Sequence, residues 1–250
     1  MLRAVLFDFF DTLATIRKGE VFYKPALRKL HESLAASGIT VPFEEFARAY
    51  FDARDQLYSE AWKKLSEPHF NLRVSLALKQ FGHDFNPDSN EIREATSAFA
   101  DVFMGYVELD LQAIPLLTRL KPEYKLGIVS NFALPECLRK LTKQFGLDDF
   151  LDVLVISADI DKRKPDPVIF EKALCALDVE ASDVVFVGDT PKTDVKGARS
   201  VGMKTILLNR THVVVDGEAL LYVQGEDDSN TKPDYAVDHL LSVADILADC

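Results

Sequence analysis

Aspartates that follow short apolar runs are the residues of this chain with the clearest chemical potential. Asp8 comes directly after the run 4–7, Asp189 is the second residue after the run 184–187, and Asp194 lies a little further on. Carboxylates that gather at one place repel one another unless a cation lies between them. A few oxygen ligands are typical of Mg²⁺, which keeps several waters and accepts phosphate oxygens. The pattern therefore predicts a Mg²⁺ site, provided that the fold brings the two runs together.

Further polar side chains follow the same kind of apolar run elsewhere in the chain. Each of them by itself is a weak signal, because Asp, Asn, Ser and Thr also serve as ordinary turn residues. A lysine among them would offset the charge of the carboxylates and of an anionic substrate. The set consists of Asp11 and Thr12 after the first run, Ser130 and Asn131 after the run 126–129, and Lys164 after the run 153–156.

The second half of the chain alternates apolar runs with segments of helical spacing, which is typical of βαβ units. Runs without polar positions indicate strands that are buried on both faces of a parallel sheet. The run 4–7 must join this sheet, because a lone strand is not stable. The predicted fold class is α/β, with a Rossmann-like doubly wound parallel sheet, in which ligands bind beyond the carboxyl ends of the strands. Predicted strands cover 126–129, 153–156, 184–187 and 205–208, and predicted helices cover 114–120, 135–145, 168–177 and 195–201.

The residues between the first strand and the rest of the sheet have a different pattern. Apolar residues recur there at helical spacing, and we predict no strand between Leu13 and Leu109. The sequence thus predicts an α/β core of residues 1–13 and 109–250 and an inserted all-helical domain of residues 14–108. The predicted helices of the insert cover 25–37, 42–65, 72–81 and 92–107. After the last βα unit, we predict a hairpin over 213–223, a mobile polar stretch over 224–232, a strand over 235–237 and a helix over 240–247.

The composition narrows the classes of partner. The 250 residues carry 40 acidic and 29 basic side chains, a net charge of −11, which argues against nucleic acid and anionic membrane surfaces. No apolar run approaches the ~20 residues of a membrane helix, and Asp8 interrupts the first apolar run too early for a signal peptide. Cys137, Cys175 and Cys250 form no CxxC pair, which fits a reducing compartment. We expect a cytoplasmic monomer or homodimer that acts on a small-molecule substrate.

The polar residues fall in four ordered segments that resemble the motifs of the haloacid dehalogenase (HAD) superfamily. The order of the segments, and the place of each one after a predicted strand, make the resemblance specific. It covers the whole chain, and the inserted helices resemble the C1-type cap of this superfamily. The four segments are Asp8-Phe9-Phe10-Asp11-Thr12-Leu13, Ser130-Asn131, Lys164-Pro165, and Gly188-Asp189 with Asp194.

The resemblance implies a role for each matching residue. Asp8 matches the nucleophile, which forms an aspartyl phosphate in the phosphatases of the superfamily. Lys164 matches the basic residue that offsets the charge of the nucleophile and of the phosphoryl oxygens. The resemblance further implies that Thr12 and Ser130 bind the transferred group and that Asn131 contacts the substrate or the neighbouring motif. It implies that Asp8, Asp189 and the backbone carbonyl of Phe10 bind Mg²⁺. It also implies that Asp194 supports the metal site.

The sequence departs from the phosphatase pattern at Phe10. The phosphatases usually carry a second aspartate at this position, which protonates the leaving oxygen and later activates water. Loss of such a group typically slows a reaction by ~10²–10⁴-fold.

Three hypotheses follow from this departure. The first is a slow Mg²⁺-dependent phosphatase, or one that uses another acid such as Asp11 or acts on substrates whose leaving group needs little protonation. The second is a 2-haloacid dehalogenase, whose branch tolerates an aromatic residue at position 10 and needs no metal. The third is a non-catalytic relative that binds a phosphorylated ligand or a partner. Asp189 and Asp194 favour the first hypothesis, because the dehalogenases replace the last acidic motif with a serine-rich one.

Two features of the inserted helices have more than one interpretation. Arg54 begins a segment that faintly resembles a dehalogenase segment, and we expect its side chain to be solvated. Aromatic side chains could wall a substrate pocket, but a helical aromatic stripe more often packs in a core, and we expect core packing here. The stripe consists of Phe22, Tyr23, Tyr50, Phe51, Tyr58, Trp62 and Phe70.

Overall fold

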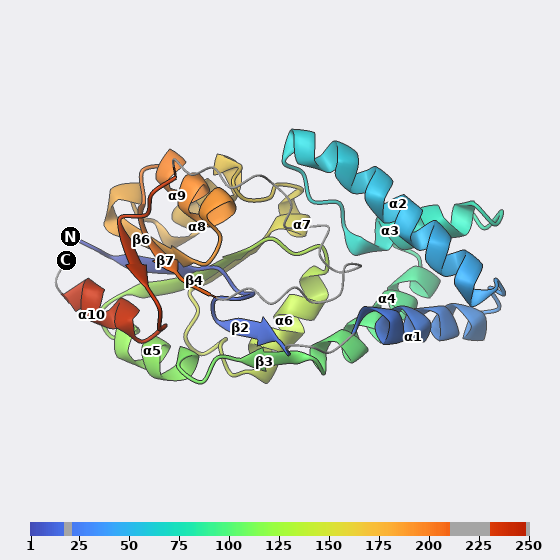
Figure 1. The fold of residues 1–250 in the computed structure, drawn as a ribbon, viewed down its shortest axis with the longest axis horizontal. Coiled ribbons are helices and arrows are strands. Elements are labelled where there is room, and N and C mark those ends of the chain that lie inside the picture. The colour runs from blue at the N-terminus through green and yellow to red at the C-terminus, as the bar shows by residue number, and fades with distance from the viewer. Residues whose placement is uncertain (18–21, 211–230, 249–250) are drawn as a thin grey trace.

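The computed structural model describes residues 1–17, 22–210 and 231–248. Six strands form one sheet in the order β5-β4-β1-β6-β7-β8, and all neighbouring strands are parallel (Figure 1). The strands are β1 (Ala4–Phe7), β4 (Lys125–Ser130), β5 (Val153–Ile156), β6 (Val184–Gly188), β7 (Lys204–Leu208) and β8 (Tyr235–Val237). The prediction of an α/β fold with a doubly wound parallel sheet is therefore confirmed. Because β1 lies between β4 and β6, the residues that follow it emerge near the middle of the sheet's edge.

Helices cover both faces of the sheet, and the side chains of β1 show why its sequence is apolar throughout. Val5 and Phe7 belong to one hydrophobic core, whereas Ala4 and Leu6 belong to a second core on the opposite face. Successive side chains of a strand point to opposite faces, so a strand between two helical layers has no position exposed to water. The first face is covered by α5 (Ala113–Leu120), α6 (Pro135–Gln144) and α10 (Ser242–Ala248), and the second by α8 (Pro167–Leu177) and α9 (Lys196–Ser200).

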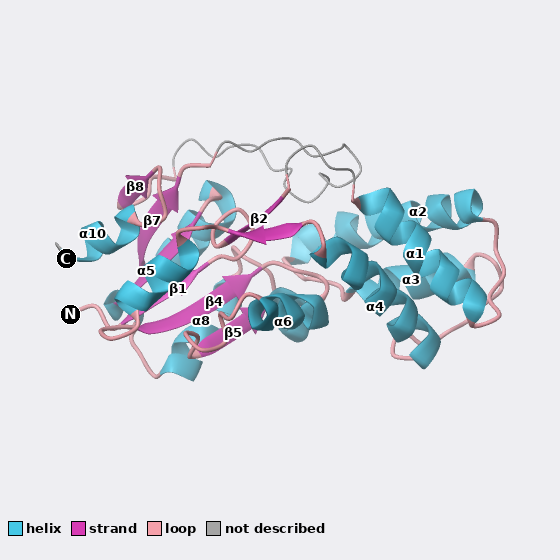
Figure 2. Cartoon of the chain, turned by 90° about the horizontal axis from the view of Figure 1, so that it is seen from below, coloured by secondary structure: helices cyan, strands magenta, loops and turns pink. Residues whose placement is uncertain are grey.

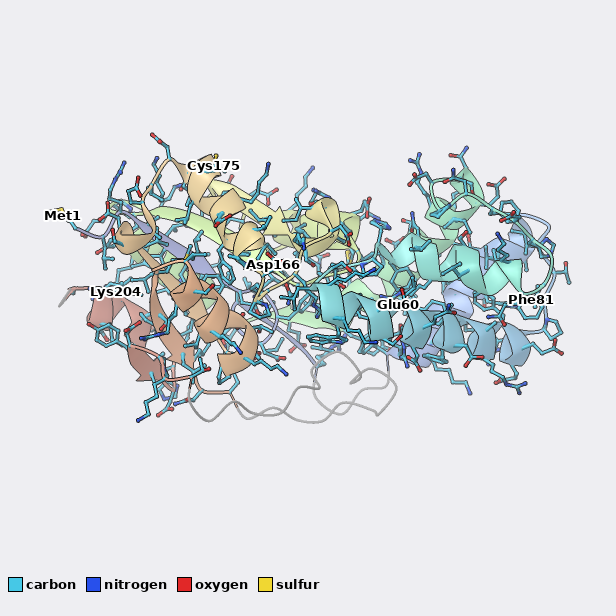
Figure 3. All side chains as sticks on the ribbon, turned by 90° about the horizontal axis from the view of Figure 1, so that it is seen from above. Met1, Glu60, Phe81, Asp166, Cys175 and Lys204 are labelled. Carbon is cyan, nitrogen blue, oxygen red and sulfur yellow. The ribbon has the colours of Figure 1, made fainter. Side chains whose placement is uncertain are left out.

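Four helices form a separate unit at one end of the molecule, as Figure 2 shows. Apolar stripes pack α1 against α4 and α2 against α3. Met1 and Phe81 lie at opposite ends of the molecule, and Asp166 lies between them, near the junction of the core and the helical unit (Figure 3). The predicted helices of the insert are thus present. They are α1 (Tyr23–Ala36), α2 (Phe43–Lys64), α3 (Phe70–Lys79) and α4 (Asn90–Met104).

The prediction of no strand between Leu13 and Leu109 is wrong. The short strands β2 (Ala14–Ile16) and β3 (Val107–Leu109) pair antiparallel where the chain enters and leaves the helical insert. Each strand has only three residues, which is too short for a recognisable alternation. Their hydrogen bonds come from a partner about ninety residues away, so only the tertiary fold creates them.

Other local elements also differ from the prediction. A short helix, α7 (Ser157–Ile160), follows β5, and a π-helix, η2 (Pro191–Val195), precedes α9. The predicted hairpin over 213–223 and most of the polar stretch over 224–232 lie outside the described residues. No helix in the described part of the chain has the length and apolar character needed to cross a membrane.

Candidate active site

Three carboxylates and one lysine come together in a buried cluster beyond the carboxyl ends of the strands. Lys164 Nζ lies 2.6 Å from Asp8 Oδ1 and 2.7 Å from Asp194 Oδ1. Oxygens of Asp8, Asp189 and Asp194 lie within 4.8 Å of one another. All four side chains are buried, and Lys164 is only 1% exposed. The parallel sheet brings these residues together from positions far apart in the sequence.

The loop after β6 uses Asp194 as a structural anchor. Asp194 Oδ2 accepts hydrogen bonds from the backbone N–H groups of Asp189 at 3.1 Å and Thr190 at 3.0 Å. The side chain of Asp194 packs directly on Gly188, where a Cβ atom would clash with its carboxylate. Both oxygens of Asp194 are therefore in use, one with the two amides and one with Lys164. Asp8 and Asp189 remain as the carboxylates best placed for a cation.

Burial dominates the electrostatics of the cluster. Burial raises the pKa of Asp8 to about 6, although Lys164 lowers it. Burial, together with the charges of Asp194 and Asp8, raises the pKa of Asp189 well above its usual range. Burial alone would lower the pKa of Lys164, but Asp194 and Asp8 more than offset this effect, so the net shift is upward. Asp8 is thus mostly ionised at neutral pH, and Lys164 stays charged.

The donor set of this cluster fits Mg²⁺. Three carboxylates face one ammonium group, so the cluster has excess negative charge when its acids are ionised. A divalent cation would relieve this repulsion, and Mg²⁺ prefers oxygen ligands such as these. The side chains of Asp8 and Asp189 would hold the ion. The contribution of the Phe10 carbonyl stays a prediction from the resemblance.

The polar residues next to the cluster have distinct surroundings. Thr12 Oγ1 donates to Asp189 Oδ1 at 3.4 Å. Ser130 is 1% exposed, and its hydroxyl makes no hydrogen bond to any described residue. Burial of a hydroxyl without a hydrogen-bond partner costs free energy. A hydroxyl left in this state is typical of a group that binds a ligand. Asn131 Oδ1 accepts from Lys164 N at 2.7 Å and its Nδ2 donates to Lys164 O at 3.0 Å, so it fixes the backbone of the neighbouring motif.

The side chains of Phe10 and Asp11 lie in different surroundings. The ring of Phe10 packs with centroids 4.9 Å from both Phe9 and Phe132 and 6.0 Å from Phe103. It therefore occupies an aromatic cluster beside the carboxylates. Asp11 is exposed and has a left-handed backbone with φ of 56°. Its role as an alternative acid stays a prediction.

Arg210 holds the loop after β1 in place and was not predicted. Its Nη2 donates to Thr12 O at 3.0 Å and to Asp110 Oδ2 at 2.5 Å, and its Nε donates to Asp11 O at 3.1 Å. Arg210 also lies just past a strand, β7. It therefore satisfies the criterion used for the other candidate residues, a polar side chain shortly after a strand of the sheet. Its partners lie one hundred to two hundred residues away along the chain, and the sequence contains no sign of these contacts.

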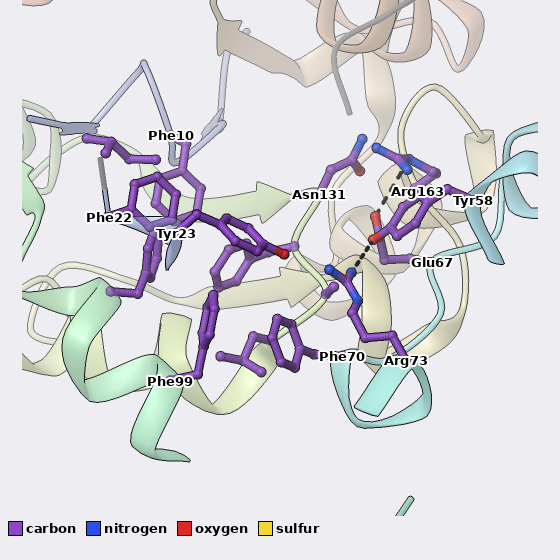
Figure 4. Close-up of a pocket in the computed structure, with 15 residues that line it drawn as sticks. Phe10, Phe22, Tyr23, Tyr58, Glu67, Phe70, Arg73, Phe99, Asn131 and Arg163 are labelled. Atoms are coloured by element: carbon purple, nitrogen blue, oxygen red, sulfur yellow. Dashed lines mark hydrogen bonds and ion pairs between the residues drawn. The ribbon is translucent and has the colours of Figure 1, made fainter. Parts of the chain in front are cut away.

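A cavity of about 200 Å³ lies between the core and the helical insert (Figure 4). Four members of the aromatic stripe are buried in the hydrophobic core, as predicted, and also line this cavity. Their rings lie where the helices meet the core, so they line the cavity as well as one another. These four are Phe22, Tyr23, Tyr58 and Phe70.

Arg54 is buried, with 3% exposure, which contradicts the expectation of a solvated side chain. Its guanidinium carbon lies 4.7 Å from the centre of the Phe51 ring, and its Nε lies 2.7 Å from Asp55 Oδ1. The aromatic ring and the carboxylate replace water around the charge. Phe51 lies three residues before Arg54 on α2, so helical spacing already places its ring beside the charge.

Comparisons with known proteins agree on the fold. The sequence matches a model of the haloacid dehalogenase-like hydrolases over residues 2–202. A glyceraldehyde 3-phosphate phosphatase from Methanopyrus kandleri is 30% identical over 213 residues, which cover 84% of this chain and 85% of the relative.

Solved structures resemble this chain over almost its full length. A 2-haloacid dehalogenase from Pseudomonas syringae pv. Tomato DC3000 has 25% identity and a TM-score of 0.67, with 100% of this chain and 99% of the other covered. A HAD phosphatase from Thermococcus onnurineus also has 25% identity, with a TM-score of 0.59 and 98% of each chain covered. The comparisons thus include both a phosphatase and a dehalogenase.

Proposed function

Because this chain belongs to the haloacid dehalogenase-like hydrolase family, we propose that it is a Mg²⁺-dependent phosphatase of a small phosphorylated metabolite. The observation that carries this proposal is the buried carboxylate of Asp8, which forms an ion pair with Lys164 and lies beside Asp189. The phosphatase from Methanopyrus kandleri supports it. The family inferred from the four sequence motifs is confirmed.

The reaction has two displacement steps. Asp8 attacks the phosphorus, the bond to the leaving oxygen breaks, and an aspartyl phosphate forms. A pKa of about 6 keeps Asp8 ionised, and therefore nucleophilic, at neutral pH. Lys164 offsets charge on the phosphoryl oxygens, and the unpaired hydroxyl of Ser130 donates to one of them. Water then attacks the phosphorus, which releases inorganic phosphate and restores the carboxylate of Asp8.

Asp8 and Asp189 would hold the metal, together with the carbonyl of Phe10. Bound Mg²⁺ would offset the negative charge of the phosphoryl group in the water-poor site. Asp194 keeps Lys164 and the loop after β6 in position, because both of its oxygens are already engaged.

Phe10 makes the reaction slow. No carboxyl group stands at this position to protonate the leaving oxygen or to activate water, so water itself supplies and removes these protons. Hydrolysis of the aspartyl phosphate then limits turnover. Rapid-quench experiments should trap phosphoenzyme that accumulates before the steady state. Steady turnover without such accumulation would contradict the proposed rate-limiting step.

Phosphate release with and without Mg²⁺ tests the phosphatase itself. Asp8→Asn should abolish release, because an amide is not a nucleophile. Asp101→Asn, an exposed position on α4, is the matched control and should retain activity. Phosphate release that survives Asp8→Asn would refute the proposed nucleophile.

A 2-haloacid dehalogenase is the second candidate function. Phe10 and the structural likeness to the dehalogenase from Pseudomonas syringae favour it, because halide leaves without a proton. The buried Asp189 beside Asp8 weighs against it, since a metal-independent displacement gains nothing from a second acid there. A halide-release assay with 2-chloropropionate should be silent, and halide release without phosphate release would reverse the ranking. Silence in both assays would favour a non-catalytic ligand-binding relative.

The cytoplasmic location and the choice between a monomer and a homodimer stay predictions. Size-exclusion chromatography with light scattering decides the second point.

A further inference from the structure

The cavity between the core and the helical insert is lined by residues that neighbour the proposed catalytic residues in the sequence. Phe10, which lines it, lies two residues after Asp8, and Arg163, which also lines it, directly precedes Lys164. The side chain of Lys164 enters the acidic cluster, whereas that of Arg163 faces the cavity. A substrate with its phosphoryl group on Asp8 therefore has the cavity available for the rest of the molecule.

Aromatic rings form one side of this cavity, and charged side chains form the other (Figure 4). Among its lining residues, two guanidinium groups face a single carboxylate. All three charged side chains are at least nine-tenths buried. The excess of one positive charge in an apolar cavity favours an anionic ligand. The labelled rings on the aromatic side are those of Phe10, Phe22, Tyr23, Phe99 and Phe70, and the charged side chains are Glu67, Arg73 and Arg163, with Tyr58 beside them.

The carboxylate of Glu67 already has partners for both of its oxygens. Tyr58 Oη donates to Oε1 at 2.5 Å, and Ser157 Oγ donates to Oε2 at 3.2 Å. Arg163 Nε lies 3.6 Å from Oε2, which makes an ion pair but no hydrogen bond. Glu67 thus orients the guanidinium of Arg163 without satisfying its donors.

Arg163 is held rigidly, and its donors are not saturated. Its guanidinium carbon lies 4.2 Å from the centre of the Trp62 ring and 5.7 Å from that of Tyr58, and its backbone N–H donates to Leu65 O at 2.9 Å. Its buried Nη1 makes no hydrogen bond with any part of the chain that the structure describes. A buried donor without an acceptor costs free energy. A ligand carboxylate would supply the missing acceptor, because its two oxygens match the donors of a guanidinium group.

Arg73 adds a second positive charge beside this point. Its Nη2 donates to Tyr58 Oη at 3.0 Å, and its Nη1 donates to Tyr50 Oη at 3.4 Å. Tyr58 therefore links Arg73 to Glu67, and the charged side of the cavity forms one connected network.

From these contacts we infer that the substrate carries a carboxylate, which accepts hydrogen bonds from Arg163, on an aromatic or aliphatic body that packs against the rings. This inference rests on the proposed phosphatase function and narrows the substrate class to small carboxylated phosphomonoesters. The phosphoryl group occupies the acidic cluster next to Lys164, and the carboxylate occupies the charged side of the cavity.

Two aryl phosphates of nearly equal shape test the charge requirement. 4-Carboxyphenyl phosphate and 4-carbamoylphenyl phosphate differ by one negative charge at the position that Arg163 would contact. Hydrogen bonds to charged groups predict that kcat/KM favours the carboxylate by roughly 10- to 100-fold, mainly through KM. Equal kcat/KM values, or a preference for the carboxamide, would overturn the inference.

Variants of Arg163 locate the effect. Arg163→Gln should bring the ratio of the two kcat/KM values close to one, and Arg163→Lys should retain part of the preference because it keeps the charge. Arg139→Gln removes the same charge from an exposed position on α6 and should leave both rates unchanged. A preference that survives Arg163→Gln would refute the assignment to this residue. If Arg163→Gln does not fold, Arg163→Lys and the two wild-type rates decide the point.

A binding measurement separates this inference from the proposed function. Calorimetry with benzoate and benzamide needs no turnover, and benzoate should bind at least about tenfold more tightly. Selective benzoate binding without phosphate release from any ester would support the carboxylate site and refute the phosphatase. Phosphate release from both esters, with equal binding of benzoate and benzamide, would support the phosphatase and refute the carboxylate site.

Discussion

Replacement of Lys164 by methionine should destabilise the protein strongly, because one ammonium group serves two buried carboxylates. Lys164 Nζ lies 2.6 Å from Asp8 and 2.7 Å from Asp194, and the three residues are at most 8% exposed. Methionine fills a similar volume but leaves both acids without their cation. Breaking a buried ion pair costs about 3–5 kcal/mol of unfolding free energy. The double contact places this variant at the upper end of that range.

The expected loss is measurable as a shift in Tm. For a chain of this size, a loss of about 5 kcal/mol lowers Tm by roughly 10–20 °C. Lys162→Met is the matched control, because Lys162 lies two residues away, is partly exposed and pairs with Asp166 at 3.0 Å. The buried Asp166 keeps a hydrogen bond from the backbone N–H of Val168, and the partly exposed Lys162 leaves the pair in contact with water. Pairs that remain in contact with water contribute at most about 1 kcal/mol, so the control should lose only a few degrees.

Thermal unfolding in the presence of a chelator measures both variants without contributions from bound metal. Addition of Asp8→Asn to Lys164→Met should raise Tm, since it removes one of the two unpaired charges. A Lys164→Met variant as stable as Lys162→Met would refute the reasoning. A double variant less stable than Lys164→Met would also refute it.

Three further predictions concern the same cluster. Phe10→Asp should raise the rate of phosphate release with Mg²⁺ by up to ~10²-fold in steady-state assays, because it restores a proton-transfer group. An unchanged rate would mean that another group already transfers the proton. Mg²⁺ affinity should fall at low pH, because protons compete for Asp8 and Asp189, whose pKa values are raised by burial. From the pKa of Asp8, about 6, calorimetry should find a Kd about tenfold higher at pH 5 than at pH 7, and a pH-independent Kd would exclude these ligands. Gly188→Ala should place a Cβ against the carboxylate of Asp194 and lower Tm and activity together, at a cost of about 1–3 kcal/mol, and a fully active, stable variant would show that this contact is dispensable.

The strands of the sheet and the polar residues at its edge can be predicted from the amino-acid pattern. Strands buried on both faces have apolar residues throughout, and polar residues follow within two positions, so Asp8, Ser130 and Asp189 stand out without knowledge of their partners. The carboxyl ends of parallel strands meet at one edge. Together with the order of the four motifs, this rule was enough to predict the meeting of Asp8, Lys164 and Asp189.

Which charged side chains are buried, and which residues they contact, depends on the folded arrangement of the chain. Lys162, Arg163 and Lys164 form a basic run in the sequence, yet Lys162 is partly exposed, Arg163 faces the cavity and Lys164 enters the acidic cluster. The burial of a charge depends on aromatic rings and carboxylates that arrive from distant segments, such as Glu67 and Trp62 beside Arg163. Local spacing does not encode these long-range partners, and therefore the carboxylate-binding side of the cavity became visible only in the folded chain.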